Sequence, residues 1–300
     1  MSMPITNKIS NDDLPALYRA SDKASFTAQN QFVILTATNL GLMIVAAILG
    51  SLTLSDTPGK TMLAIITAIL LTIGIFITIV IRTSKLEQAW YDGRAIAESV
   101  KTLAWRYMTG SAPYPISLGT KATEIFILSL HSLLEERKTF AARLGGQHGT
   151  AQQITDRMNM VRNLSTEERK KIYLSERLDE QRNWYSDKTE ANLRSANRFF
   201  MGTVTSQALA IISAFTLVIW QGSLIQLTGI FTTLAAAFLA WTQMKRNEEL
   251  AQSYGLAAQE LILIHEQSPR IRTDEELSTY VVNSENAISR EHTMWLARRS

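Results

Sequence analysis

The sequence contains no cysteine, which excludes disulfide bonds and removes a common zinc ligand. Its four histidines lie far apart along the chain, and no two of them have the spacing of a metal site; they are His131, His148, His265 and His292. A zinc site would need carboxylates from several helices, so we expect neither a metal nor another cofactor. The absence of cysteine is also compatible with a reducing compartment.

Motifs of catalysis and nucleic-acid binding are missing as well. The sequence has no Walker A motif and no Gly-x-Ser-x-Gly, and the glycine-rich segment 145–149 follows no strand pattern, so a flexible linker is favoured over a phosphate loop. The 30 Lys and Arg residues nearly balance the 27 Asp and Glu residues, and they form no strongly basic cluster. We therefore expect neither an enzyme nor a nucleic-acid-binding protein.

Charge is absent from three long stretches, 24–55, 61–81 and 199–244. A bilayer core about 30 Å thick needs about 20 apolar residues at about 1.5 Å per residue, so the stretches hold one, one and two membrane spans. Helices in the core of soluble proteins rarely run so far without a charge. We predict four transmembrane helices, at 32–54, 61–81, 203–220 and 224–244.

The connections between the spans are short, which makes each pair of helices an antiparallel hairpin. A Pro-Gly turn occurs in 55–60, and 221–223 is the only break in the third stretch. Only Lys60 lies in an outer turn, whereas basic residues flank the other span ends, at Arg82, Lys85, Arg194, Arg198, Lys245 and Arg246. The positive-inside rule therefore predicts a multi-pass protein of the inner (cytoplasmic) membrane with both termini in the cytoplasm.

Each half of the sequence repeats one plan: an approach helix, two spans with a tight turn, a basic step and a long cytoplasmic helix. This indicates a tandem duplication, with one two-span module in 1–150 and the other in 151–300, although few residues are identical between the halves. No alternating strand pattern occurs. We predict an all-α membrane protein whose four transmembrane helices form two hairpins, with cytoplasmic helices forming a bundle or coiled-coil-like body.

The cytoplasmic helices are predicted from apolar periodicity and from capping signals. They cover 84–108, 121–144, 166–200, 247–266 and 274–296, with a linker as far as 163. Capping boxes are expected where Ser165 precedes Glu168 and where Thr273 precedes Glu276. One apolar face of the 84–108 helix is formed by residues at alternating spacings of three and four, namely Leu86, Trp90, Gly93, Ala97, Val100, Ala104 and Tyr107.

No ionisable residue lies inside the predicted spans, which argues against a pump or a proton-coupled transporter. The costliest polar side chains there are the amides of Asn39, Gln207 and Gln226, because an unpaired amide in hydrocarbon costs several kcal/mol, on the order of 2–7. Each of them should face another helix, headgroups or water. They are our candidates for pore-lining or interhelical polar residues.

Small residues recur at four-residue spacing within the spans. Such faces let helix backbones approach closely, either within one hairpin or between subunits. The candidate packing residues are Ala37, Gly41, Ala46, Gly50, Gly229, Thr233 and Ala237.

Two further motifs carry a family resemblance. The segment 86–101, with the sequence LEQAWYDGRAIAESVK, precedes a Trp-Arg-Tyr triplet and two prolines, and the second half has aromatic and charged residues between Tyr173 and Lys188. The first motif is similar to the cytoplasmic helix of a SLATT domain (SMODS and SLOG-associating two-transmembrane effector domain, of the DUF4231 type), and the second resembles the lead-in of another SLATT subtype. Tyr254, Asn286 and Trp295 are similar to the tail of that subtype.

The matching motif positions imply contacts among the cytoplasmic helices. They are Trp90, Tyr91, Arg94, Glu98, Trp105, Arg106, Tyr107, Arg177, Gln181, Trp184 and Tyr185. From spacing alone, Arg94 and Glu98 can pair along one helix, which contributes about 0.3–0.5 kcal/mol when exposed. If they are buried, they should reach another helix, in the second module or in a second subunit. A structural contact is favoured over a ligand site.

The resemblance implies two tandem SLATT modules in a membrane effector of bacterial conflict systems. The family is predicted to form pores or to perturb the membrane when a nucleotide or another signal is sensed during phage infection. Many relatives are fused to, or encoded beside, a nucleotide-signalling or TIR-type sensor, and this sequence contains no such domain. The trigger should therefore come from a separate sensor protein or from the helical cytoplasmic part.

Two functional hypotheses follow. The first is a homo-oligomeric effector whose hairpins assemble around a gated opening in the lipid bilayer. The second is a scaffold that conducts nothing and anchors a cytoplasmic partner at the membrane.

Overall fold

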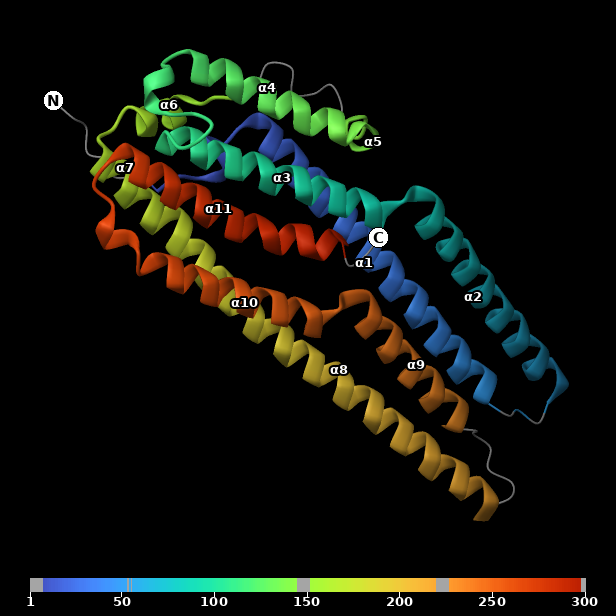
Figure 1. Ribbon diagram of the computed structural model, residues 1–300. Helices are drawn as coiled ribbons and strands as arrows, with labels where there is room; N and C mark the ends of the chain where they lie inside the picture. The colour runs from blue at the N-terminus through green and yellow to red at the C-terminus, as the bar shows by residue number, and fades with distance from the viewer. Residues whose placement is uncertain (1–7, 53, 55, 145–151, 220–226, 298–300) are drawn as a thin grey trace. The chain divides into compact units, whose positions relative to one another are not determined.

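The computed structural model describes residues 8–52, 54, 56–144, 152–219 and 227–297, with side chains described as far as 289. The described residues are mostly helical and contain no strand, as the all-α prediction requires. Figure 1 shows the helices along the chain. In order they are η1 (Asn11–Asp13), α1 (Ala16–Ser51), α2 (Thr57–Ser84), α3 (Leu86–Thr109), η2 (Ile116–Leu118), α4 (Lys121–Glu136), α5 (Lys138–Ala141), α6 (Asp156–Arg162), α7 (Thr166–Tyr173), the π-helical turn η4 (Leu174–Leu178), α8 (Asp179–Ile219), α9 (Leu227–Lys245), α10 (Asn247–His265), η5 (Ser268–Arg270) and α11 (Asp274–Ala297).

Four helices, α1, α2, α8 and α9, are long and apolar enough to cross a membrane, which confirms the four predicted spans. They form two hairpins, α1 with α2 and α8 with α9 (Figure 1). The chain is therefore a multi-pass membrane protein. The predicted span residues 220 and 224–226 and the turn at 221–223 lie outside the described residues.

The chain separates into two compact units. One, which we call the helical body, comprises the described residues of 1–28, 87–189 and 252–300. The other, which we call the hairpin unit, comprises the described residues of 29–86 and 190–251. This division differs from the predicted modules 1–150 and 151–300, because each module contributes segments to both units.

Helix α3 provides much of the core of the helical body. Its predicted apolar face is buried, with Val100 and Ala104 having no exposed surface. Ser25 of α1 donates a hydrogen bond to the carbonyl of Trp90 at 2.8 Å, and Phe140 of α5 packs against Gly93, where a side chain would collide with its ring. The small residues of α3 therefore let its neighbours approach its backbone.

The predicted helix 121–144 is wrong at its C-terminal end. Helix α4 ends at Glu136, because Arg137 has a non-helical backbone with φ −128° and ψ 49°. The guanidinium of Arg137 pairs with Asp92 of α3, and Phe140 in the next helix is buried. These contacts with α3 turn the chain at a position that the local sequence does not mark.

The predicted linker up to 163 is also wrong in part, because it contains α6. Thr155 caps this helix by accepting a hydrogen bond from the Met158 amide at 3.2 Å. The side chains of Met158 and Val161 have no exposed surface. A helix of seven residues is too short to show clear periodicity, so burial against the rest of the helical body stabilises it.

The two modules share a backbone feature at the basic step. Lys85, between α2 and α3, has φ 49°, and Arg246, between α9 and α10, has φ 48°. They are the two non-glycine residues with positive φ in the part of the chain that the structure describes. Since a left-handed residue interrupts a helix, each break separates a membrane-crossing helix from the helix that follows it.

Both predicted capping boxes are present. Glu168 accepts a hydrogen bond from the Ser165 amide at 3.0 Å and so begins α7, while Glu276 accepts one from the Thr273 amide at 3.1 Å and so begins α11. From α7 the chain continues as helix through η4 into α8, so the helix opened by Ser165 runs into the third span.

Candidate functional site

The most deeply buried charges in the helical body are those of Arg177 and Glu285. Arg177 Nε and Nη2 donate to the two carboxylate oxygens of Glu285 at 2.9 and 2.8 Å. The Tyr173 hydroxyl and the Thr102 hydroxyl donate to the same carboxylate at 3.0 and 2.8 Å. The side chains of Arg177 and Glu285 are 1% and 0% exposed. This cluster joins α3, α7, η4 and α11.

The π-helical turn positions the basic side of this cluster. Its wider ring of hydrogen bonds inserts an extra residue into the helix, and such turns occur often at functional sites. Tyr173 precedes the turn and Arg177 lies within it, and both reach Glu285. Arg177 also donates to the Gln181 side chain at 3.3 Å, one turn further along α8.

The arginine of the buried pair stays protonated because an acidic side chain faces it. Burial alone would lower the pKa of the Arg177 guanidinium, but the facing Glu285 carboxylate outweighs burial and raises it. Burial and the same carboxylate raise the pKa of the Tyr173 hydroxyl well above its ordinary value. Tyr173 therefore stays protonated as a hydrogen-bond donor, and the cluster is suited to holding helices in register rather than to moving protons.

A second cluster of motif residues is aromatic. The Arg94 guanidinium lies 5.8 Å from the ring centroid of Trp184, and the Lys188 ammonium lies 5.7 Å from the same ring. Trp184 in turn contacts Tyr185 and Tyr254, with ring centroids 5.4 and 5.2 Å away. Arg94 therefore reaches from the first motif on α3 to the second motif on α8.

Charged groups on α1 and α3 adjoin these clusters. The Lys101 ammonium lies 5.8 Å from the Tyr18 ring centroid. Burial lowers the pKa of Lys101, and the charge of Arg177 lowers it further. Burial, together with the charge of Glu98, raises the pKa of Asp22. The packing of α1 on α3 thus depends on ionisable groups that burial disfavours in their charged forms.

The remaining motif residues make structural contacts. Trp90 stacks on Tyr91 at 4.6 Å between ring centroids, and Trp105 meets the edge of Tyr173 at 5.8 Å. Arg106 donates to Asn286 of α11 at 2.7 Å.

Tyr107 and a buried arginine close the C-terminal end of α3. The Tyr107 hydroxyl donates to Asn159 of α6 at 3.1 Å. The Arg162 guanidinium lies over the Tyr107 ring and donates to the carbonyls of Tyr107 and Tyr114, both at 2.8 Å. The side chain of Trp295, the last residue of the resemblance, lies outside the described side chains.

Of the three predicted membrane amides, Asn39 has an interhelical contact. Its amide nitrogen donates to the Thr78 hydroxyl at 3.3 Å, and Thr78 lies one turn before Arg82. The Asn39 carbonyl oxygen is buried without a hydrogen-bond partner among the described residues. Gln207 is exposed on α8, and Gln226 lies outside the described residues.

The predicted packing residues separate into two groups. Ala46 and Ala237 are buried, whereas Ala37 is exposed and Thr233 donates to the Gly229 carbonyl of its own helix. A side-chain carbon added at Gly41, Gly50 or Gly229 would have no atom of the described residues within 4 Å. These three glycines are therefore not needed for packing within a hairpin.

Sequence reasoning missed the two glycines that pack inside the hairpins. A side-chain carbon at Gly74 would lie 3.0 Å from the Asn39 carbonyl oxygen, and one at Gly202 would lie 3.1 Å from the Phe238 ring. Gly74 and Gly202 each have a small residue four positions later, Thr78 and Ser206, so the spacing marks them no less than the predicted packing residues. The large residue on the opposite helix is the relevant partner, and only the hairpin register reveals it.

The structure brings no metal-binding group together in the described part of the chain, where no three His, Asp or Glu side chains could hold an ion. Two family models match the sequence. Residues 15–170 match the SMODS and SLOG-associating 2TM effector domain 3, and residues 173–295 match the SMODS and SLOG-associating 2TM effector domain 1. Neither the curated proteins nor the solved structures include a match. The second family match begins at Tyr173, at the start of the π-helical turn.

Proposed function

Because the chain belongs to the SLATT family of two-transmembrane effector domains and carries two of them in tandem, we propose that several copies assemble their hairpins around an opening in the membrane. The observation that carries this proposal is the set of open small-residue faces in the hairpin unit. Gly41, Gly50 and Gly229 pack against nothing in the described part of their own chain. In hydrocarbon, such faces favour close contact with another helix.

The side chains that the hairpin helices expose differ in size, which supports assembly through the hairpins. Helix α9 exposes Gly229, Thr232 and Ala236. Helix α2 exposes large apolar side chains such as Met62 and Phe76, which are 65% and 66% exposed, besides the small Ala68. Large side chains pack well against lipid tails, while small ones let two backbones meet. The small face of α9 is thus our candidate for contact between copies, and the large residues of α2 for contact with lipid.

An opening needs more than one copy of the chain. Four helices packed together fill their own centre with side chains, and the described spans contain no ionisable residue that could line a charged path. Neutral polar groups such as Thr232 and the exposed amide of Gln207 would then provide hydrogen bonds along a wet surface. The resulting oligomer would dissipate ion gradients rather than transport one substrate.

The proposed setting is bacterial conflict defence at the inner membrane, where a separate sensor protein of the nucleotide-signalling or TIR type would supply the trigger. The basic steps at the hairpin ends support a cytoplasmic position for the helical body and both termini. Since the chain has no cysteine, single engineered cysteines can report this orientation. A membrane-impermeant maleimide should label Lys60→Cys on intact cells and Lys171→Cys only after permeabilisation; the reverse pattern would overturn the orientation.

The proposal is tested by measuring membrane potential in cells that express the chain. With a potential-sensitive dye, we expect depolarisation during phage infection. Ala236→Leu should abolish it by enlarging the small face of α9, and Phe76→Leu, at an exposed large residue of α2, should not. An unchanged potential in the presence of expressed wild-type protein, with and without phage, contradicts the pore.

The alternative is a scaffold that conducts nothing and anchors a partner. It is favoured by large apolar side chains that the helical body leaves exposed, namely Leu128 on α4 at 68% and Leu263 on α10 at 69%. A partner that covers these side chains would remove their apolar surface from water. Co-purification of a partner that is lost in Leu128→Glu, with the membrane potential intact, would establish the scaffold instead.

A further inference from the structure

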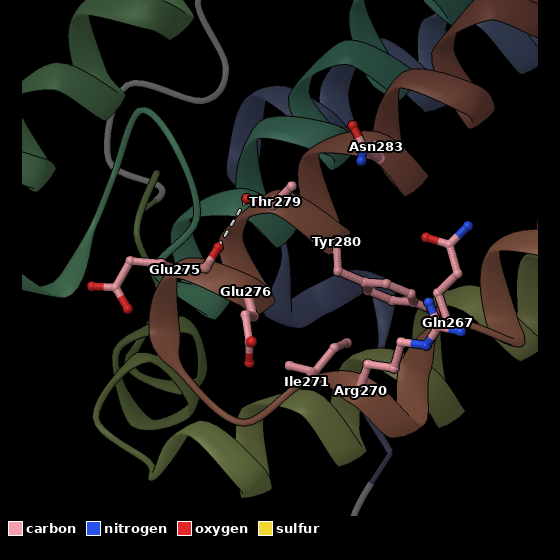
Figure 2. Close-up of a pocket in the computed structure, with 8 residues that line it drawn as sticks. All are labelled: Gln267, Arg270, Ile271, Glu275, Glu276, Thr279, Tyr280 and Asn283. Carbon is pink, nitrogen blue, oxygen red and sulfur yellow. Dashed lines mark hydrogen bonds between the residues drawn. The ribbon is translucent and has the colours of Figure 1, made fainter.

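The helical body contains a pocket of about 340 Å³ where η5 and the end of α10 face α11. Gln267, Arg270 and Ile271 form one side of it, and Thr279, Tyr280 and Asn283 of α11 form the other. Figure 2 shows the Tyr280 ring extending from α11 toward Gln267 and Arg270. The volume is in the range of small-molecule sites, about 300–1,000 Å³.

The pocket has a polar group that requires a partner. Tyr280 is only 5% exposed, and its hydroxyl has no hydrogen-bond partner among the described residues. Burial raises the pKa of this hydroxyl, and the charge of Asp179 raises it further. Burying a hydroxyl without a hydrogen-bond partner is unfavourable, so a water molecule or a ligand must form a hydrogen bond with it.

Asp179, whose charge acts on Tyr280, does not itself line the pocket. Its Oδ1 atom lies 3.2 Å from Arg182 Nη1 and 3.6 Å from His265 Nδ1. Among the described residues that line the pocket, the Tyr280 hydroxyl is therefore the buried group without a partner, and it can both donate and accept a hydrogen bond.

The rim of the pocket carries charges of both signs. The Arg270 guanidinium makes no ion pair or hydrogen bond in the described part of the chain. Glu276 Oε2 accepts hydrogen bonds from the Arg272 and Thr273 amides, which lower the pKa of this carboxyl and keep it ionised. Its second oxygen remains available. Figure 2 shows the side chains of Arg270 and Glu276 at separate points around Ile271.

We propose that this pocket binds a small zwitterion, with the anionic group of the ligand on Arg270 and its ammonium group on Glu276. The Tyr280 hydroxyl and the amides of Gln267 and Asn283 bind polar atoms between the two ends. Charge complementarity favours the zwitterion, because Arg270 suits an anionic group whereas the two acidic lining residues, Glu275 and Glu276, suit an ammonium group.

The location of the pocket indicates what occupancy would do. Helix α11 contributes Tyr280 and Asn283 to the pocket and, two residues later, Glu285 to the buried pair with Arg177. A ligand that fixes α11 therefore acts on the contact that joins α11 to α3, α7 and η4. The inference that ligand binding regulates the effector rests on the proposed function. The inference that the pocket binds a ligand does not.

The test is isothermal titration calorimetry on the purified full chain in detergent. Three matched probes are titrated: γ-aminobutyrate, which has both charges, butyrate, which has only the carboxylate, and butylamine, which has only the ammonium. We expect saturable binding of γ-aminobutyrate, and binding of the other two weaker by about tenfold or more, because each loses one charge-assisted contact.

Three variants and one control assign the site. Arg270→Gln and Glu276→Gln should each weaken γ-aminobutyrate binding about tenfold, and Tyr280→Phe, which changes no shape, should weaken it several-fold. Lys171→Gln is the matched control, since Lys171 is exposed and does not line the pocket. Thermal unfolding of each variant establishes that it is folded before titration.

The absence of saturable γ-aminobutyrate binding overturns the proposal and leaves the pocket with ordered water. Equal affinity for butylamine or butyrate overturns it as well, as does unchanged affinity in Arg270→Gln and Glu276→Gln. A chain that depolarises membranes yet fails these titrations would refute the pocket and leave the effector proposal standing. A chain that binds γ-aminobutyrate as expected but does not depolarise membranes would support the pocket and refute the effector proposal.

Discussion

At the scale of single residues, the buried pair of Arg177 and Glu285 is the most sensitive point of the helical body. A carboxylate with no exposed surface is tolerated because a guanidinium and two hydroxyls satisfy both of its oxygens. Removing one partner leaves an uncompensated buried charge, which costs far more than the intact pair contributes. The pair therefore adds little net stability, but each of its side chains makes the other one necessary.

We expect Arg177→Met to lower the free energy of unfolding by about 3–5 kcal/mol, because the charge of Glu285 is then buried alone. The double variant Arg177→Met with Glu285→Leu should recover part of this loss, since it removes both charges but leaves the Tyr173 and Thr102 hydroxyls without their acceptor. Denaturant unfolding of the detergent-purified protein measures both. Additive losses in the double variant would show that the two side chains do not interact.

The two capping boxes give the protein a stability that depends on pH. Hydrogen bonds from Ser165 lower the pKa of Glu168, and backbone amides lower that of Glu276, below the ordinary value of 4.5. A depressed carboxyl pKa contributes stability that is present above the ordinary value and is lost as pH falls through the folded one. Glu168→Gln combined with Glu276→Gln should therefore flatten the decline of melting temperature in acid. An equally steep decline in wild type and variant would contradict this role.

At the scale of elements, each hairpin is held by one glycine that faces a larger residue. Gly202 of α8 lies under Phe238 of α9, and Gly74 of α2 lies beside Asn39 of α1. Gly41 has nothing opposite it in the described residues. Glycines in membrane helices therefore differ in role, and the difference depends on the neighbouring helix rather than on the spacing along their own.

Substitution by alanine should separate these roles. Gly202→Ala and Gly74→Ala should destabilise their hairpins by about 1–3 kcal/mol, because the added carbon overpacks a close contact. Gly41→Ala should leave the monomer unchanged or stabilise it by up to about 1 kcal/mol, because alanine is the better helix former. Unfolding in mixed detergent micelles measures the three variants. Equal destabilisation by all three would show that Gly41 is also packed within its hairpin.

At the scale of the whole molecule, the membrane helices could be predicted from sequence and the contacts between distant helices could not. Hydrocarbon imposes a local rule, since any charge within a span is costly, and the borders of the charge-free stretches therefore locate α1, α2, α8 and α9. Capping boxes are also local, and both were predicted. The turn at Arg137 and the short helix α6 depend on partners in α3 and elsewhere in the body.

The candidate site divides in the same way. The motif residues Arg94, Arg177 and Trp184 could be selected as contacts between cytoplasmic helices, because their pattern resembles a family. Glu285 could not, since a single glutamate on a charged helix gives no sign that it is buried opposite an arginine more than 100 residues earlier. The pocket around Tyr280 was likewise hidden: its lining residues all lie within 267–283, but nothing in that stretch of sequence shows that the Tyr280 hydroxyl is buried without a partner among the described residues.

Association of the hairpins through the small face of α9 is the central claim, and the absence of native cysteine allows it to be measured directly. Ala236→Cys places a thiol on the small face of α9, and Phe76→Cys places one at an exposed large residue of α2. On mild oxidation in native membranes, Ala236→Cys should form disulfide-linked dimers and Phe76→Cys should remain monomeric. Monomeric Ala236→Cys, or equally strong cross-linking of both variants, would contradict the claim.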